Sequence, residues 1–222
     1  KKVITWKKSK ISQNNNKPIG VGSRVGTTSK DVGTTPVEFV KDEAELLEKF
    51  QEYVKEISPD FLVGYFSDGF DLPYLKARAD GNKIKLSLGL DGSQQKFSRG
   101  MNLTGKINGI VHVDILKFIR TAYAQYMKSE TLSLNEVAKE FLGDTKKPFE
   151  HKHSSKIKHN EWETYYEYNL HDSILTLGLF DKFWPDMLEF SKTIQEPIFE
   201  ISRAGLSKYV ESYILHNLEK FN

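Results

Sequence analysis

Two short apolar runs with a helical pattern between them constrain the fold of this chain more than any other feature. Phe61–Tyr65 and Ile110–Ile115 have the length and the apolar character of buried strands. The segment that starts at Pro73 has proline in the first turn of a predicted helix, where proline is favoured. Because strands and helices alternate in this way, the sequence predicts an α/β fold.

Apolar spacing and helix-capping residues predict further elements around this unit. We expect strands at 3–6, 37–40 and 83–88. We expect helices from Asp42 to a stop at Pro59, over 116–126, from Ser133 over 134–142, over 162–183 with an end at Trp184-Pro185, and over 187–222 with a break near Pro197.

Composition excludes several classes of protein. Aromatic residues make up 12% of the 222 residues, which is too many for a disordered chain. No apolar run reaches the roughly 18 residues of a membrane span, and the start has no signal-peptide pattern. The absence of Cys excludes disulfides, a thiolate zinc site and a Cys nucleophile, and it indicates a cytoplasmic location. Because there is no initiator Met, we expect the chain to begin inside a longer protein.

Two segments contain an acidic residue that is a candidate for ligand binding or catalysis. Asp71 follows the predicted strand at 61–65 and lies where a helix begins, and ligands of α/β sheets bind at such strand ends. Its alternative role is a helix N-cap. Tyr168 and Asp172 lie four residues apart and therefore share one face of a predicted helix. The alternative there is an ordinary exposed helix face.

Taken together, these segments resemble a known family. Asp60–Leu75 resembles the second exonuclease motif of family B DNA polymerases, most closely the archaeal ones, and Tyr168–Asp172 fits the third motif, Tyr-x-x-x-Asp. The likeness extends to 3–8, 110–119 and 196–203, whereas 7–35 resembles a polar loop insertion. The resemblance implies a ribonuclease-H-like 3′–5′ exonuclease domain over 1–190, with a central mixed β-sheet flanked by helices. It also implies that 191–222 is a helical connection toward the polymerase palm.

The resemblance also implies roles for individual residues. Asp71 and Asp172 would bind Mg²⁺ or Mn²⁺ in a two-ion site, and Tyr168 would orient the attacking water. Phe66, Ser67 and Phe70 would contact DNA. The expected partners are the single-stranded 3′ end, the primer-template and the rest of the polymerase chain, without a membrane.

Two departures from the family pattern affect this prediction. The first motif, an Asp-x-Glu pair, should lie upstream of the strand at 3–6, so the two-ion site is expected to be incomplete and the fragment weak or inactive. Phe66 stands where the family usually has Asn; it could stack on a base, but we favour a role in filling the core. Asp114 resembles a family position that is not a metal ligand.

The basic segment at 143–160, which connects two predicted helices, gives weaker indications of a binding site. Three histidines in it could bind zinc, although a solvated loop is favoured: His151, His153 and His159. Five lysines could contact phosphate or form a solvated face: Lys146, Lys147, Lys152, Lys156 and Lys158.

The resemblance therefore implies a DNA-directed DNA polymerase that carries the 3′–5′ proofreading exonuclease domain. Because the polymerase palm motifs are absent from the 222 residues, we expect the chain to be only part of that protein. The reaction would be hydrolysis of the 3′-terminal nucleotide of single-stranded DNA. One alternative is a non-catalytic DNA-binding or scaffolding module derived from such an exonuclease. Another is a free-standing nuclease that acts on RNA or DNA.

Overall fold

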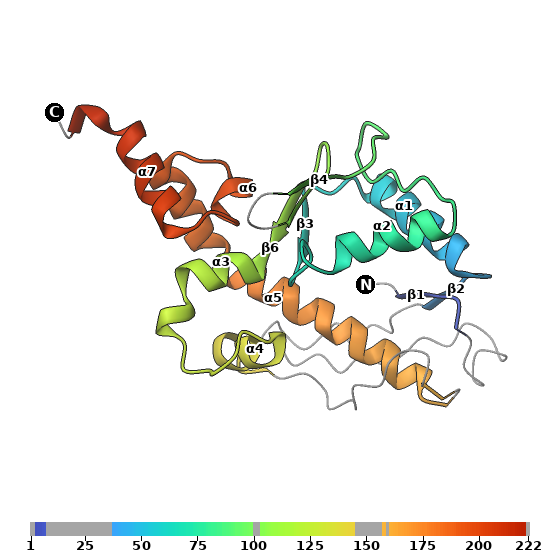
Figure 1. Cartoon of the computed structure of the whole chain (residues 1–222). Helices are drawn as coiled ribbons and strands as arrows, with labels where there is room; N and C mark the ends of the chain where they lie inside the picture. Colours follow the sequence, from blue (N-terminus) through green and yellow to red (C-terminus); the bar gives the residue numbers. More distant parts are fainter. Residues whose placement is uncertain (1–2, 8–36, 100–102, 145–156, 159, 221–222) are drawn as a thin grey trace.

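The structure is a computed structural model that describes residues 3–7, 37–99, 103–144, 157–158 and 160–220 (Figure 1). The strands are β1 (Val3–Thr5), β2 (Val37–Phe39), β3 (Phe61–Gly64), β4 (Lys96–Arg99), β5 (Leu103–Lys106) and β6 (Val111–Asp114). The helices are α1 (Glu43–Ile57), α2 (Asp71–Gly81), α3 (Ile115–Ala122), α4 (Leu134–Leu142), α5 (Trp162–Ile194), α6 (Ile198–Ile201) and α7 (Leu206–His216), with 3₁₀ turns η2 (Ala124–Tyr126) and η4 (Leu218–Lys220). The predicted α/β class is confirmed, while the insertion predicted at 7–35 lies, except for its first residue, outside the described residues.

The described strands form three two-stranded sheets, of which the β3–β6 pair positions the candidate site. β1–β2 and β3–β6 are parallel, and β4–β5 is antiparallel. In the β3–β6 pair, Gly64 lies opposite Asp114. Because the two strands are parallel, the segments that follow them leave from the same edge.

Two predicted helix starts are confirmed by their capping bonds. The side chain of Asp42 accepts a hydrogen bond from the backbone N–H of Glu45 at 3.0 Å, which begins α1. The hydroxyl of Ser133 accepts from the N–H of Glu136 at 3.3 Å, which begins α4. Each side chain therefore satisfies one of the N–H groups that a helix leaves unpaired at its start.

The strand predicted at 83–88 is wrong. Leu86 and Leu88 are buried in the core formed with α1 and α2, but the segment is irregular. The backbone N–H of Ser87 donates to the side chain of Gln51 at 2.6 Å instead of to a neighbouring strand. The alternation of apolar residues therefore indicates that the segment is buried on one side. A segment that pairs with no strand can be buried in the same way.

The end predicted for the long helix at Trp184-Pro185 is also wrong, because α5 continues through Pro185 to Ile194. Proline inside a helix removes one backbone hydrogen bond. Buried residues on both sides of it, Phe183, Met187 and Ile194, offset that cost by packing into the main core. The helix ends where Gln195 takes a left-handed conformation with φ of 62°.

Helix α5 runs past the β3–β6 pair and α4 (Figure 1). It packs against α3 and α4 through aromatic rings. Phe183 of α5 contacts Tyr123, with ring centroids 4.6 Å apart, and Phe141 of α4, at 4.8 Å. The ring centroid of Phe118 of α3 lies 6.3 Å from that of Phe183. In the described ranges, no helix combines the length and the hydropathy that crossing a lipid bilayer requires.

We expect Phe183→Ala to lower the free energy of unfolding by about 3–5 kcal/mol, because the ring is 1% exposed and its removal leaves a cavity among aromatic neighbours. Urea denaturation followed by circular dichroism measures the change. The matched control is Phe70→Ala, since that ring is 58% exposed and its loss should cost less than about 1 kcal/mol. Equal losses in the two variants would contradict the assignment of Phe183 to the core.

Candidate functional site

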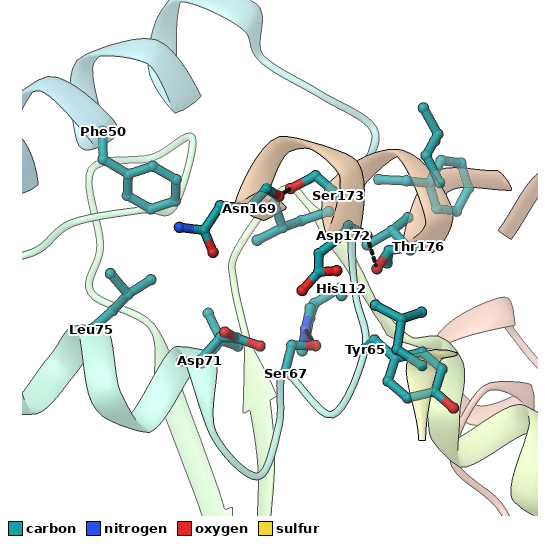
Figure 2. Close-up of a pocket in the computed structure, with 17 residues that line it drawn as sticks. Phe50, Tyr65, Ser67, Asp71, Leu75, His112, Asn169, Asp172, Ser173 and Thr176 are labelled. Carbon is teal, nitrogen blue, oxygen red and sulfur yellow. Dashed lines mark hydrogen bonds between the residues drawn. The ribbon is translucent and has the colours of Figure 1, made fainter. Parts of the chain in front are cut away.

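A cavity of about 720 Å³ lies between the end of β3, helix α2 and helix α5 (Figure 2). Polar groups enter it from four elements: Ser67 and Asp71 from the start of α2 and the turn before it, His112 from β6, and Asn169, Asp172, Ser173 and Thr176 from α5. Apolar side chains line the rest, among them Phe50, Leu72, Leu75 and Leu177. A mixed lining of this kind is typical of a ligand site.

Asp71 reaches the cavity because β3 ends at Gly64 and a turn formed by residues 65–70 leads into α2. Asp71 is the first residue of that helix, and its N-cap is Phe70, which makes no side-chain capping bond. The alternative role of Asp71 as an N-cap is therefore wrong. Its carboxyl group extends into the cavity instead (Figure 2).

Asp172 extends toward the same space from α5, so the structure brings together the acids of two segments that are far apart in the sequence (Figure 2). Asp172 is half-buried and lines the cavity, which corrects the alternative of an ordinary exposed helix face. Asn169, one turn earlier on α5, adds an amide to the same wall.

Tyr168 is not among the residues that line the cavity. It lies one turn before Asp172, is 9% exposed, and stacks against Tyr165 with ring centroids 6.5 Å apart. Its role in orienting water stays a prediction.

The 65–70 turn is held by Asp114, a buried carboxylate at the end of β6. Its two oxygens accept hydrogen bonds from the N–H groups of Phe66, at 2.9 Å, and Asp68, at 3.1 Å. Burial raises the pKa of Asp114, although these N–H donors favour the charged form. Phe66 has φ of 63°, a left-handed conformation that is uncommon for a bulky residue. Asp114 therefore fixes a turn with an unfavourable backbone conformation.

Asp68, also fully buried, is the second anchor of the turn and was missed by sequence reasoning. It accepts hydrogen bonds from the N–H of Gly105 at 2.7 Å, from Lys117 at 2.7 Å and from Arg203 at 3.0 Å. Burial acts to raise the pKa of Asp68, but the adjacent His112 ring, the N–H of Gly105 and the ammonium group of Lys117 outweigh it and hold this pKa well below its usual value. The only signal in the sequence was an acid within an apolar-flanked turn, which does not identify its partners.

Gly105 permits the close approach of β5 to this turn. A Cβ atom at this position would lie 2.5 Å from Cδ1 of Leu72 and 3.5 Å from Oδ1 of Asp68. A larger residue here would therefore require the buried side chain of Leu72 to move.

Ser67 and His112 form a buried pair on the cavity wall. The Oγ atom of Ser67 lies 2.8 Å from Nε2 of His112. The other ring nitrogen, Nδ1, lies 3.3 Å from Oδ1 of Asp68. Ser67, predicted to contact DNA, is 5% exposed, so only its cavity-facing surface is available.

The favoured interpretation of Phe66 as a core residue is wrong, because this side chain is 47% exposed. The backbone of Phe66 is fixed by Asp114, and its ring lies over Gly69, where a Cβ atom would come within 2.4 Å of the ring. Phe70 and Tyr74 are 58% and 52% exposed, with ring centroids 5.5 Å apart and planes inclined by 11°. An exposed aromatic surface therefore adjoins Asp71.

The carboxylate oxygens of Asp71 and Asp172 suit a hard cation, since Mg²⁺ and Mn²⁺ prefer oxygen ligands of this kind. Within the described part of the chain, no group of three or more His, Asp or Glu side chains is arranged to hold a metal ion. Among the residues that the structure describes, only Asp71 and Asp172 supply carboxylates to the cavity. The three histidines considered for zinc, and all five lysines except Lys158, lie outside the described residues.

We expect Asp71→Asn to raise the melting temperature of the cation-free protein at pH 7. Partial desolvation where the carboxyl group faces the cavity, with a further contribution from the charge of Asp114, raises the pKa of Asp71, although the residue as a whole is exposed. The folded state then binds a proton more tightly than the unfolded chain, so stability falls as pH rises from the unfolded pKa through the folded one. The advantage of the neutral variant should shrink as the pH falls from 7 to about 4.

Thermal unfolding in EDTA across this pH range measures the difference. Asp80→Asn, at the other end of α2 and outside the cavity, is the matched control. A variant at position 71 that is no more stable than the wild type at pH 7 would contradict the assigned cause.

Comparison with known proteins identifies the family of the chain. Residues 1–137 match the family described as DNA polymerase family B, exonuclease domain. The chain is 32% identical over 202 residues to a DNA polymerase of Pyrococcus glycovorans and 33% identical over 196 residues to one of Methanocaldococcus jannaschii. Each match covers 88% of this chain but only 25% and 12% of the relative.

A solved structure of a family B DNA polymerase also resembles this chain. The family B DNA polymerase from the hyperthermophilic archaeon Pyrobaculum calidifontis superimposes with a TM-score of 0.62 at 25% identity, over 81% of this chain and 24% of that one. The chain thus spans a quarter or less of these relatives. The predicted ribonuclease-H-like exonuclease fold is consistent with this likeness, and the chain belongs to the family B DNA polymerase exonuclease-domain family.

Proposed function

We propose that this chain is the exonuclease-domain part of a DNA-directed DNA polymerase, and that it removes the 3′-terminal nucleotide of single-stranded DNA by cation-dependent hydrolysis. The observation that carries the proposal is the shared cavity of Asp71 and Asp172. These two acids belong to the second and third motifs of the family resemblance, and the family match supports the same reaction.

Asp71 and Asp172 would hold Mg²⁺ or Mn²⁺. When bound, such cations activate a water molecule and stabilise the leaving oxygen in phosphodiester hydrolysis. Two carboxylates are few for a two-ion site, and the 222 residues contain no Asp-x-Glu sequence of the first motif. We therefore expect the 222-residue chain by itself to be weak or inactive and the longer protein to be active.

The remaining cavity residues suit a nucleotide. Ser67 and Asn169 provide hydrogen-bonding groups for a phosphate or sugar, and Leu72 and Leu75 provide an apolar surface for a base. Tyr168 would act by orienting the attacking water, as the family resemblance implies. A cytoplasmic location follows from the same proposal.

The exposed rings of Phe66, Phe70 and Tyr74 would stack on bases of the strand that enters the cavity. Aromatic stacking suits single-stranded DNA because every base has an aromatic face, and each stacked base contributes about 1–3 kcal/mol. Phe70, the N-cap of α2, precedes Asp71 directly in the sequence, and its ring stacks on that of Tyr74 in the first turn of the helix.

Residues 191–222 would connect this domain to the polymerase palm. Helix α7 and the turn after it expose apolar side chains that no described element covers: Leu206, Val210, Ile214, Leu215 and Leu218. The rest of the polymerase chain would cover this surface.

We expect the double variant Asp71→Ala/Asp172→Ala, made in the longer protein, to degrade end-labelled single-stranded DNA at least about 100-fold more slowly than the wild type in Mn²⁺. The loss of both carboxylates removes the charge that holds the cations, and loss of one preorganised charge-stabilising group already costs about 10²–10³-fold in other enzymes. The matched control is Asp80→Ala/Asp181→Ala, which removes exposed acids from the same two helices.

Equal rates in the wild type and the Asp71/Asp172 variant would refute the proposed catalytic role. The scaffolding alternative would be favoured if the wild type bound single-stranded DNA without degrading it.

We expect Phe70→Ala and Tyr74→Ala each to weaken binding of single-stranded oligo(dT) by about 5- to 150-fold, which corresponds to the loss of one stacked base. Fluorescence anisotropy in EDTA measures binding without hydrolysis. Tyr126→Ala is the control, because Tyr126 is 74% exposed but lies on η2. Unchanged affinity in both α2 variants would show that these rings do not bind the strand.

A further inference from the structure

A buried ion pair connects the segment between α6 and α7 to the 65–70 turn. The Nε atom of Arg203 donates to Oδ2 of Asp68 at 3.0 Å, and the two side chains are 7% and 0% exposed. The two residues are 135 positions apart in the sequence. A charge pair this deeply buried requires well-matched geometry, because both charges have lost their water.

The same guanidinium also fixes His112. Its Nη1 donates to the carbonyl oxygen of His112 at 2.7 Å, and its Nη2 lies 2.8 Å from Nδ1 of the ring. His112 in turn contacts Ser67 on the cavity wall. Arg203 does not itself line the cavity, but it reaches two residues next to the candidate ligands: Asp68, within the 65–70 turn, and His112.

Arg203 is held on its own side by the end of α6. Its Nη1 also donates to the hydroxyl of Ser202 at 2.8 Å and to the carbonyl of Phe199 at 3.2 Å. The guanidinium lies 4.0 Å from the centroid of the Phe199 ring. The position of the guanidinium therefore follows the position of α6.

Charge balance is one part of this arrangement, because two buried carboxylates, Asp68 and Asp114, lie beside the cations Lys117 and Arg203. Lys117 of α3 donates to the same oxygen of Asp68 at 2.7 Å. What Arg203 adds is a planar fork that contacts Asp68 and two atoms of His112 together, which the single ammonium group of lysine cannot do. The forked geometry of its contacts therefore distinguishes Arg203 from Lys117.

We propose that Arg203 is a positioning residue for the exonuclease site: by holding Asp68 and His112, it keeps Asp71 and Ser67 facing the cavity, and it makes the site depend on the docking of residues 198–216. The inference rests on the proposed function, since the positioned residues are those assigned to hydrolysis. A misplacement of about 1 Å at such a site can cost about 10²-fold in rate.

The test uses Arg203→Lys in the longer protein, because this change keeps the charge and removes the fork. We expect kcat for 3′-end hydrolysis to fall about 10- to 100-fold with little change in KM for DNA. Hydrogen exchange measured by mass spectrometry should become about tenfold faster in residues 66–72 and stay unchanged in α1 and α4. The exchange measurement needs neither a cation nor activity.

The matched control is Arg78→Lys. Arg78 also forms a forked contact, with Nε donating to Glu43 at 2.7 Å, but it is exposed and lies at the far end of α2. This variant should leave both kcat and the exchange of residues 66–72 unchanged.

Two results would overturn the inference: wild-type kcat and exchange in Arg203→Lys, or faster exchange throughout the domain with a lower melting temperature, which indicates a merely structural role. Failure of the proposed function is distinguishable, because then the Asp71→Ala/Asp172→Ala variant would match the wild type in activity whatever the exchange data show.

Discussion

The candidate site depends on two buried carboxylates that hold one turn. Asp114 accepts the N–H groups of Phe66 and Asp68, and Asp68 accepts donors from β5, α3 and the segment after α6. A buried carboxylate is costly unless it is hydrogen-bonded or paired, and together these contacts offset that cost. The turn therefore has one position relative to the sheet, and Asp71 follows it.

The same constraint explains an uncommon conformation at Phe66. A bulky residue with positive φ is unfavourable by itself, and it persists where the surrounding structure fixes the backbone. Here the carboxylate of Asp114 binds the N–H of Phe66 directly. The consequence is that the ring is exposed on the turn that precedes Asp71.

Local sequence signals predicted β1, β2, β3, β6 and the two capped helices but not β4 and β5, and the family resemblance selected Asp71 and Asp172. The errors share one cause, which is that burial depends on partners distant in the sequence. The segment at 83–88 is buried without a strand partner, and α5 continues past Pro185 because Phe183 and Met187 pack into the core. The exposure of Phe66 follows from Asp114, which lies 48 residues away.

The sequence by itself determined the α/β class, the helix caps at Asp42 and Ser133, and the membership of the two acids in motifs of one family. Those properties depend on spacing and on neighbours within a few residues. Only the tertiary structure decided that Asp71 and Asp172 share a cavity, and that Asp68 pairs with Arg203. The physical reason is that a buried charge is stabilised by the groups around it in space, and the order of residues along a chain does not specify which groups those are.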